Sequence, residues 1–420
     1  MKKYFFIAIL FVSVSLAAQT PAQDSSFQKI RFGGYGELLY QHMDYGANRY
    51  KDPAGSLPDK RAYITLPRAI FAVDYKFRSD IVLGTEVEFE YGGTGSAMEL
   101  EYAEGGEYEM EVEKGGEVVL EQFHITKSFG QAFNIRVGHM IVPIGLTNAH
   151  HEPIFYFGTV RPEGDMTIIP CTWHETGISF LGYIPQLKLN YELMIVNGLD
   201  PNGFSRANWV GSARQKMFEQ TIMTAPAFTG RLEYTPIRNL RIGASGYYNR
   251  SAKNSTKPEH MSQVNGDVMI ISGDVQYRGN NLVARANIIY GTLSDSEEIG
   301  NINRKAFKRT TYPCTPVAAA AMAYGTEIGY NVFSLFSFSD TKLFPFVRYE
   351  YCNTFEKTQG SIVSEPRYKR SLCTVGLNYY ILPNLVVKAD YAMRKIDNGN
   401  YNNENTFGIS VGYTGWFVQK

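Results

Sequence analysis

The sequence predicts an all-β protein: a transmembrane, up-and-down antiparallel β-barrel of about sixteen strands. Three observations predict it. Apolar and polar residues alternate in successive segments from about residue 31, short and long gaps between the segments also alternate, and charges gather on one face of many segments. Short turns at one end and long loops at the other are typical of bacterial outer-membrane barrels. The short gaps fall at 78–80, 129–131, 184–186, 236–239, 278–281 and 382–384, and the long ones near 44–60, 92–116, 142–173, 198–226, 250–265, 292–322, 354–367 and 396–404.

Residues 1–18 are expected to be a secretory signal peptide. Lys2 and Lys3 give the positive start, and an apolar stretch follows before two small residues, Ala17 and Ala18. An uncleaved anchor is the alternative, but the apolar run is too short for a spanning helix. Residues 19–30 are expected to be a periplasmic lead-in, and residues 31–420 the barrel domain.

The composition suits a membrane barrel and argues against several other classes. Lys and Arg together number 41, as do Asp and Glu, so the formal net charge is zero. No basic patch or stripe of the kind that binds nucleic acid stands out. The 29 Tyr and 26 Phe residues suit the aromatic girdles of a barrel. A secreted β-sandwich is also rich in tyrosine, but sandwiches lack this regular asymmetry of turns.

Alternation with a period of two assigns each predicted strand two faces. Many charges fall on the face opposite the apolar one, and each unpaired charge in a dry core would cost on the order of several kcal/mol. We therefore expect the charged face to line a water-filled lumen and the apolar face to contact lipid. A slip of one residue would exchange the faces. The arginines expected to line the lumen are Arg68, Arg136, Arg231, Arg285 and Arg348.

The segment at 92–116 is expected to lie outside the membrane. Glutamates alternate with apolar residues in it, and Gly-Gly pairs flank the run, which predicts an acidic hairpin rather than two more spanning strands. An even number of strands then leaves both termini at the end with the short turns, which is the periplasmic end in such barrels.

The longest loop, at 142–173, is expected to constrict the pore. Its candidate constriction residues are Arg161, Glu163 and Asp165, and Arg161 either faces the pore or pairs with Asp165. Prolines and glycines fix or free the backbone, so we expect several residues here to shape the loop. The expected loop-shaping residues are Pro143, Gly145, Pro170, Trp173, Glu175 and Gly177, with Trp173 packing inside or lying in a girdle.

Two further residue patterns are weighed and left without an assigned function. His150, His151 and Glu152 are adjacent, but neighbouring side chains diverge on an extended backbone, so we predict no metal site. Cys171 and Cys314 lie in two predicted outer loops. They would be able to pair in an oxidising compartment or remain as thiols, and the sequence does not decide between these.

The chain resembles the phosphate-selective porin O and P family. The matching residues are Gly33-Gly34-Tyr35-Gly36-Glu37, Pro67-Arg68-Ala69, Arg136-Val137-Gly138, Pro143-Ile144-Gly145, Ile169-Pro170, Trp173, Glu175-Thr176-Gly177 and Val196-Asn197-Gly198. The resemblance implies a sixteen-stranded, usually trimeric channel whose third loop folds inward and whose basic lumen residues pass anions, phosphate among them. The chain departs from this pattern because loop 142–173 holds one arginine against three acids, and because the inward acids and bases of the predicted strands roughly balance. Anion preference needs a positive field in the lumen, so the resemblance implies the channel but not the phosphate selectivity.

The expected function is passive diffusion of small hydrophilic or ionic solutes across the bacterial outer membrane, with anions such as phosphate as one class. The expected partners are outer-membrane lipid, lipopolysaccharide and two further copies of the chain in a homotrimer, with no cofactor. The alternative is an adhesin or ligand receptor that uses the extracellular loops. A hydrolase would need a nucleophile next to a base, and no such arrangement of Ser and His stands out.

Overall fold

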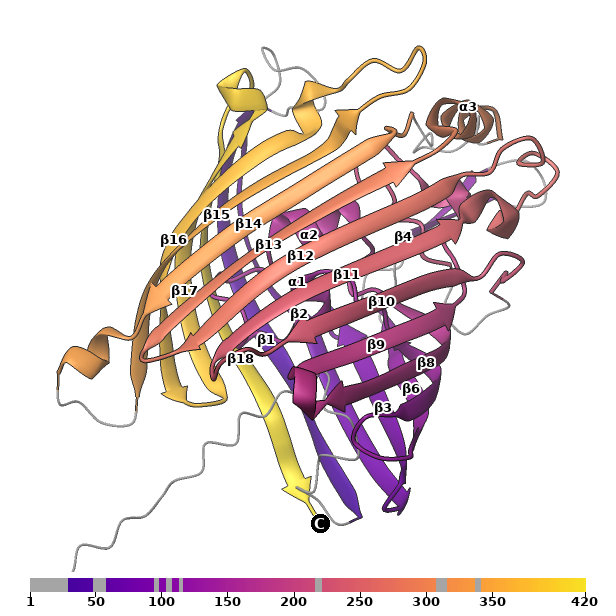
Figure 1. The fold of residues 1–420 in the computed structure, drawn as a ribbon. Helices are drawn as coiled ribbons and strands as arrows, with labels where there is room; N and C mark the ends of the chain where they lie inside the picture. The colour runs from indigo at the N-terminus through magenta and orange to yellow at the C-terminus, as the bar shows by residue number, and fades with distance from the viewer. Residues whose placement is uncertain are drawn as a thin grey trace, which may run out of the picture.

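Sixteen antiparallel strands close into one barrel in the computed structural model (Figure 1). The structure describes residues 29–47, 58–93, 98–102, 108–112, 116–215, 221–306, 316–336 and 341–420. The predicted class and strand number are confirmed. The barrel strands are β1 (Ile30–Ala47), β2 (Pro58–Arg78), β3 (Ile81–Glu90), β6 (Val118–Ser128), β7 (Asn134–Ile141), β8 (His174–Ile184), β9 (Leu189–Val196), β10 (Ala227–Tyr234), β11 (Leu240–Arg250), β12 (Asp267–Gly279), β13 (Leu282–Leu293), β14 (Ala320–Tyr330), β15 (Lys342–Lys357), β16 (Lys369–Leu382), β17 (Leu385–Ile396) and β18 (Glu404–Gln419).

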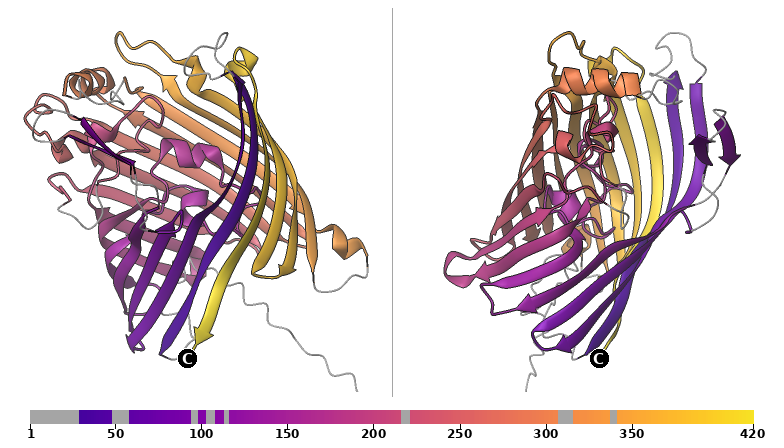
Figure 2. Two further views of the ribbon diagram at one scale, coloured as in Figure 1. Left: turned by 180° about the vertical axis from the view of Figure 1, so that it is seen from behind. Right: turned by 90° about the vertical axis from the view of Figure 1, so that its right-hand side faces the viewer.

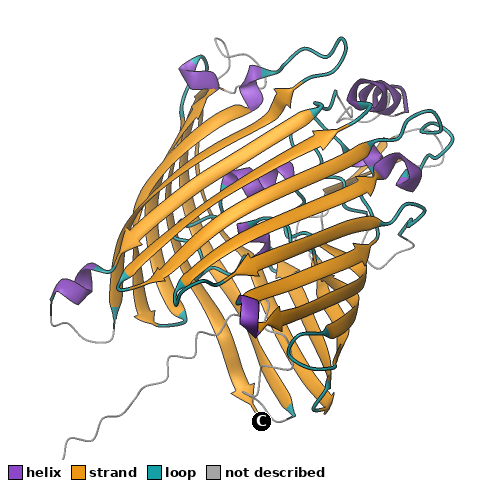
Figure 3. Ribbon diagram, in the orientation of Figure 1, coloured by secondary structure: helices purple, strands orange, loops and turns teal. Residues whose placement is uncertain are grey.

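Two short strands stand apart from the barrel. β4 (Met98–Tyr102) and β5 (Tyr108–Val112) pair antiparallel with each other and not with the barrel, so the described strands of the acidic segment add none to the barrel, as predicted. Helical segments lie in the lumen and at the ends of the strands (Figure 3). They are α1 (Leu146–Ala149), α2 (Glu163–Ile168), α3 (Ser296–Ala306) and the 3₁₀ turns η1 (Pro185–Leu187), η2 (Pro201–Gly203), η3 (Ser251–Asn254), η4 (Val332–Leu335), η5 (Pro366–Tyr368) and η6 (Asp397–Gly399).

The connections follow the predicted alternation with one exception. The β14–β15 connection at 331–341 lies at the short-turn end, includes η4 and is longer than its neighbours, and no short gap in the sequence predicts it. Both described chain ends lie at this end, where Lys29 N–H donates to Lys420 O at 2.6 Å. The predicted signal peptide, most of the lead-in and Cys314 lie outside the described residues.

The outer face of the barrel is apolar, as the alternation predicts. On β18, for example, Phe407, Ile409 and Val411 are exposed, whereas Ser410 between them is buried. Exposed apolar side chains recur around the whole circumference and form one belt, which suits contact with hydrocarbon. Its members include Phe71, Phe123, Val137, Leu193, Leu232, Ile271, Ile288, Ile328, Val347, Val375, Tyr391 and Ile409. No helix within the described residues is long and apolar enough to cross a membrane.

The interior is drier than the sequence argument expects. A hydrophobic cluster fills part of it, formed by inward side chains of the wall such as Met194 and Ile270 and by loop residues such as Ile144 and Ile168. The expectation of a wholly water-filled lumen is therefore wrong for this part of the barrel. Loops that fold inward supply apolar side chains for the wall residues to pack against. The alternation along the strands gives no information about these loops.

Candidate functional site

The connection at 142–173 runs through the lumen. It leaves β7 and returns to β8, and between them α1 and α2 lie inside the wall (Figures 1 and 2). Its backbone reaches strands on the opposite side of the barrel: Phe157 N–H donates to Glu327 of β14 at 3.3 Å, and Thr159 N–H donates to Asp390 of β17 at 2.6 Å. We call residues 142–173 the crossing loop.

The wall is shaped to receive the crossing loop. A Cβ added to Gly164 of α2 would lie 2.7 Å from the Cβ of Ala323 on β14, and one added to Gly329 would lie 2.6 Å from the Phe157 ring. A Cβ on Gly412 of β18 would lie 2.7 Å from Pro153. The loop therefore packs closely where the inner wall carries small or no side chains.

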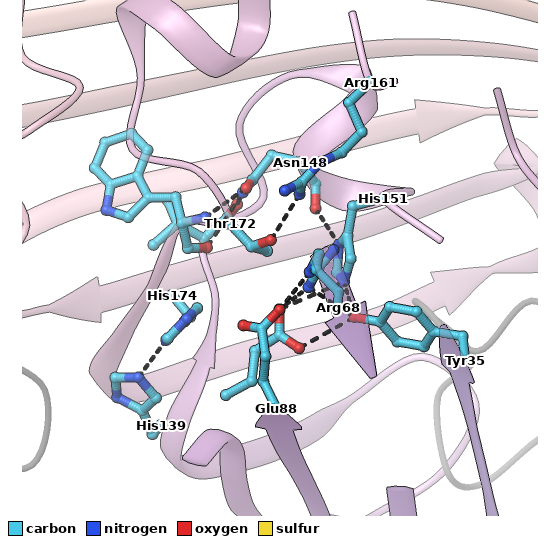
Figure 4. A network of polar contacts seen from close by, with 12 residues as sticks. Tyr35, Arg68, Glu88, His139, Asn148, His151, Arg161, Thr172 and His174 are labelled. Carbon is cyan, nitrogen blue, oxygen red and sulfur yellow. Dashed lines mark hydrogen bonds and ion pairs between the residues drawn. The ribbon is translucent and has the colours of Figure 1, made fainter. Parts of the chain in front are cut away.

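A buried polar cluster joins the crossing loop to the first strands (Figure 4). Arg68 of β2 donates to Glu88, to Glu121 at 2.9 Å and to the Tyr35 hydroxyl at 3.0 Å. The same hydroxyl lies 2.8 Å from Nε2 of His151 in the loop. Burial lowers the pKa of His151 to about 3, so this imidazole is neutral at pH 7.

The two ends of the crossing loop are fastened to each other. Asn148 donates to Val142 O at 2.7 Å and accepts from Trp173 N–H at 2.6 Å. Arg161 donates to the Thr172 hydroxyl at 2.9 Å. The alternative in which Arg161 pairs with Asp165 is therefore wrong: the Asp165 carboxylate instead accepts from Thr147 N–H and, at 2.7 Å, from Asn287 of β13.

The other acid of the predicted constriction bridges the lumen. Glu163 of α2 lies 2.6 Å from Arg370 of β16 and also accepts from Arg394 of β17 at 2.8 Å. Neither of these arginines is among the constriction residues predicted from the sequence. A pattern of alternation identifies them as inward, but it cannot show which loop acid they meet.

The arginines expected in the lumen point inward, and each pairs with an acid. Arg231 donates to both oxygens of Asp274 at 2.7 and 2.8 Å, and Arg285 lies 2.5 Å from Glu327. This second pair follows from register, because the two residues are direct partners on β13 and β14. The remaining pairs are Arg68 with Glu88 and Glu121, Arg136 with Glu192 at 3.6 Å, and Arg348 with Glu350 at 3.0 Å.

The expected loop-shaping residues lie at the base of the crossing loop. Gly145 precedes α1 with φ of 76°, a conformation that favours glycine, and Pro143 and Pro170 are buried. Trp173 is fully buried against Tyr247, with ring centroids 4.6 Å apart, so it packs inside and is not a girdle residue. Glu175 accepts from the Trp173 indole at 3.0 Å, and a Cβ on Gly177 would strike the backbone of β9.

His150 and His151 point toward opposite walls. His150 Nε2 lies 2.7 Å from Arg241 of β11, while His151 contacts Tyr35 of β1, about half the barrel away in strand order. Among the described residues, no group of three or more His, Cys, Asp or Glu side chains is placed to hold a metal ion. Cys171 is an exposed free thiol.

A cavity of about 1090 Å³ lies at the short-turn end of the lumen, and we call it the vestibule. Its lining includes the loop residues His150, Ile154, Phe155, Tyr156 and Phe157. Among the described residues that line it, five are basic and one is acidic. The sequence reasoning missed this excess because it balanced charges over the whole lumen rather than at one end. The charged lining residues are Lys188, Arg238, Arg241, Arg278, Lys342 and Glu327.

The opposite end of the barrel carries interlocked loops. We call the described parts of the β9–β10, β11–β12, β13–β14 and β15–β16 connections the loop cap. Their contacts run between connections that are far apart in the sequence, so the loops form one packed layer. The joining contacts include Trp209 Nε1 to Ala318 O at 3.0 Å, Asn202 Nδ2 to Asn303 Oδ1 at 3.0 Å and Ser296 N to Gln359 Oε1 at 2.8 Å.

Solved structures with a similar fold include an outer-membrane channel and an anion-selective porin. OmpF of Salmonella typhi, solved with daunomycin, gives a TM-score of 0.55 at 13% identity and covers 91% of this chain and 97% of its own. The fold is that of a porin barrel. The outer membrane channel DcaP of Acinetobacter baumannii (93% and 99% covered) and an anion-selective porin from Comamonas acidovorans (92% and 99%) each give 0.53 at 9% identity.

Sequence comparisons give one relative of low identity and no family. An uncharacterized protein of Aquifex aeolicus is 27% identical over 378 residues, which cover 86% of this chain and 75% of that protein. No protein-family model matches the chain. The resemblance to the phosphate-selective porin O and P family therefore stays a prediction.

Proposed function

We propose that the protein is an outer-membrane channel through which small hydrophilic or ionic solutes diffuse passively. The observation that carries this proposal is a large cavity with a charged lining inside a barrel whose outer belt is apolar. An exposed apolar belt of this extent is unfavourable in water and suits a bilayer. The porin fold supports the same function.

The vestibule gives the proposed channel a preference for anions. The described part of its lining carries five basic side chains and one carboxylate, Glu327, which lies 2.5 Å from Arg285. A wall with an excess of one charge raises the local concentration of the opposite ion. Phosphate is one solute of this class to test.

The proposed setting follows from the barrel ends. The short-turn end, which holds both described chain ends, would face the periplasm, and residues 1–18 would be removed on export. Lipid and lipopolysaccharide would surround the apolar belt. The homotrimer is implied by the family resemblance, and light scattering of the detergent-solubilised protein measures it directly.

Single-channel recording in a planar bilayer tests the proposal. The refolded full-length mature protein should give stable current steps in KCl, and a KCl gradient should give a reversal potential of the sign expected for anions. Heat-unfolded protein serves as the control. Folded protein that inserts into the bilayer and never conducts would contradict the channel function, and a cation-selective potential would contradict the proposed preference.

The second candidate function is a receptor or adhesin that uses the outer loops. The loop cap favours it, because Trp209 is fully buried within a hydrophobic cluster that joins several loops. Loops that are packed in this way present a defined surface. A receptor whose cap blocks the lumen would conduct little, so the same recording separates the two functions.

A further inference from the structure

The vestibule has a charged wall with an unpaired cation. Arg278 of β12 is exposed to the cavity, and no carboxylate of the described residues lies within ion-pair distance of it. Its guanidinium lies 5.6 Å from the centroid of the Phe155 ring in the crossing loop. Arg241 on the neighbouring strand is engaged differently, because it lies 3.3 Å from Glu233 and 2.7 Å from His150.

Glu327, the carboxylate among the described residues of the vestibule lining, does not offset the charge of Arg278. Glu327 is buried and lies 2.5 Å from Arg285 and 3.8 Å from Arg348, and it accepts from Phe157 N–H. The negative charge of Glu327 is therefore balanced by these wall arginines. Lys188 and Arg238 also line the cavity and form no ion pair with a described residue, so this part of the cavity is positive.

The other wall of the vestibule is aromatic and fixed in place. Phe157 packs against Phe344 and Phe346, with ring centroids 5.6 and 5.2 Å apart. Tyr380 meets Phe344 edge-on at 5.7 Å, and its hydroxyl donates to Ile154 O at 3.2 Å. The loop and the strands thus hold a preformed apolar surface next to the cations.

We propose that the vestibule binds organic anions that carry a carboxylate on an aromatic body. An inorganic anion such as phosphate would use only the cationic wall, and an uncharged aromatic molecule only the other. A carboxylate beside Arg278 with a ring against Phe155, Phe157 and Phe344 uses both. At about 1090 Å³, the cavity lies at the upper end of sizes for small-molecule sites, so molecules of two or more rings would fit. That these anions are transported as substrates rests on the proposed channel function.

Titration of the folded barrel with 2-naphthoate tests the inference. Calorimetry in detergent should show tighter binding of 2-naphthoate than of acetate, phosphate or 2-naphthalenemethanol. Arg278→Gln should weaken 2-naphthoate binding roughly ten-fold, which is the factor for loss of one charge-assisted contact. The matched control is Arg250→Gln, which removes the same charge from an exposed arginine at the other end of the barrel and should change nothing.

A second variant keeps the test decisive if a charge change disturbs folding. Phe344→Leu retains an apolar side chain and should weaken 2-naphthoate binding while leaving phosphate binding unchanged. Equal affinities for 2-naphthoate and acetate, or equal effects of Arg278→Gln and Arg250→Gln, would overturn the inference. Conduction without 2-naphthoate binding would refute this inference alone, and binding without conduction would refute the channel function alone.

Discussion

Arg394 of β17 donates from Nε and Nη2 to one carboxylate oxygen of Glu163, at 2.8 and 2.5 Å. The two residues are 231 positions apart in the chain. Arg370 of β16 lies 2.6 Å from the other oxygen of the same carboxylate. The helix α2 is thereby attached to the wall opposite the strands from which the crossing loop departs.

We expect Glu163→Gln to loosen the crossing loop. The substitution removes the carboxylate that Arg370 and Arg394 share and leaves Arg394 with Glu404, and loss of one partner of a buried ion pair costs about 3 kcal/mol. Chemical unfolding of the folded barrel should show this loss, and current recordings should show more open-state noise. Glu259→Gln, at an exposed acid, is the matched control and should have no effect. Equal stability of the two variants would mean that the bridge does not hold the loop.

We expect the stability of the barrel to fall as the pH rises, in part because of Glu152. Burial raises the pKa of this loop carboxyl from 4.5 to about 7. Glu152 therefore holds its proton more tightly in the folded state than in the unfolded state. Its contribution to the free energy of unfolding is complete below about pH 4.5 and is lost as the pH rises to about 7. The loss is at most about 3 kcal/mol. Unfolding of wild type and Glu152→Gln should be compared from pH 4.5 to 8, and the decline should be smaller in the variant; parallel curves would exclude Glu152 as its source.

A charge placed on the outer belt should hinder insertion into lipid. Leu193 of β9 is 52% exposed on this belt, and Leu193→Arg should reduce the free energy of folding into vesicles by about 2–4 kcal/mol. Val363→Arg introduces the same side chain at an exposed residue of the β15–β16 connection and should be tolerated. Should both variants fold equally well in lipid and in detergent, the belt would not be the membrane-facing surface.

Removal of the indole of Trp209 should open the loop cap. This side chain is fully buried, and loss of a buried tryptophan costs about 3–5 kcal/mol. Trp209→Ala should therefore make the long-loop end more sensitive to limited proteolysis. Phe129→Ala, at an exposed ring of the opposite end, controls for the loss of an aromatic residue. A rise in conductance of Trp209→Ala alone would show that the cap limits the pore, whereas unchanged proteolysis would mean that the indole does not hold the cap together.

The barrel was predictable because its determinants are local. The alternation of side chains along β2, for example, distinguishes exposed Phe71 from buried Arg68 within a few residues. The same reasoning finds the pair formed by Arg285 and Glu327 only after the register is known, since 42 residues separate them in sequence. The period-two alternation thus shows which face of a strand a residue lies on. Its ion-pair partner can be predicted only when the pairing of the strands is known.

The course of the long loops was not predictable in the same way. Glu163 meets Arg394 and Trp209 meets Ala318 through contacts between distant segments, and no periodic pattern records such contacts. The estimate of a wet and electrically balanced lumen was wrong in two places. Inward charges are buried because other strands supply their counter-ions, as Glu327 does for Arg285, and cations outnumber acids among the described residues that line the vestibule.

The hydrogen bonds that close the barrel continue to the ends of the described chain. Lys29 N–H donates to Lys420 O at 2.6 Å, and Lys420 N–H donates to Ile30 O at 2.9 Å. A short peptide joining these ends would turn the seam between β1 and β18 into one more hairpin. A circularly permuted gene that begins in the β14–β15 connection would therefore encode the same barrel, with its new termini on the same face. The fold itself therefore does not dictate where the chain begins.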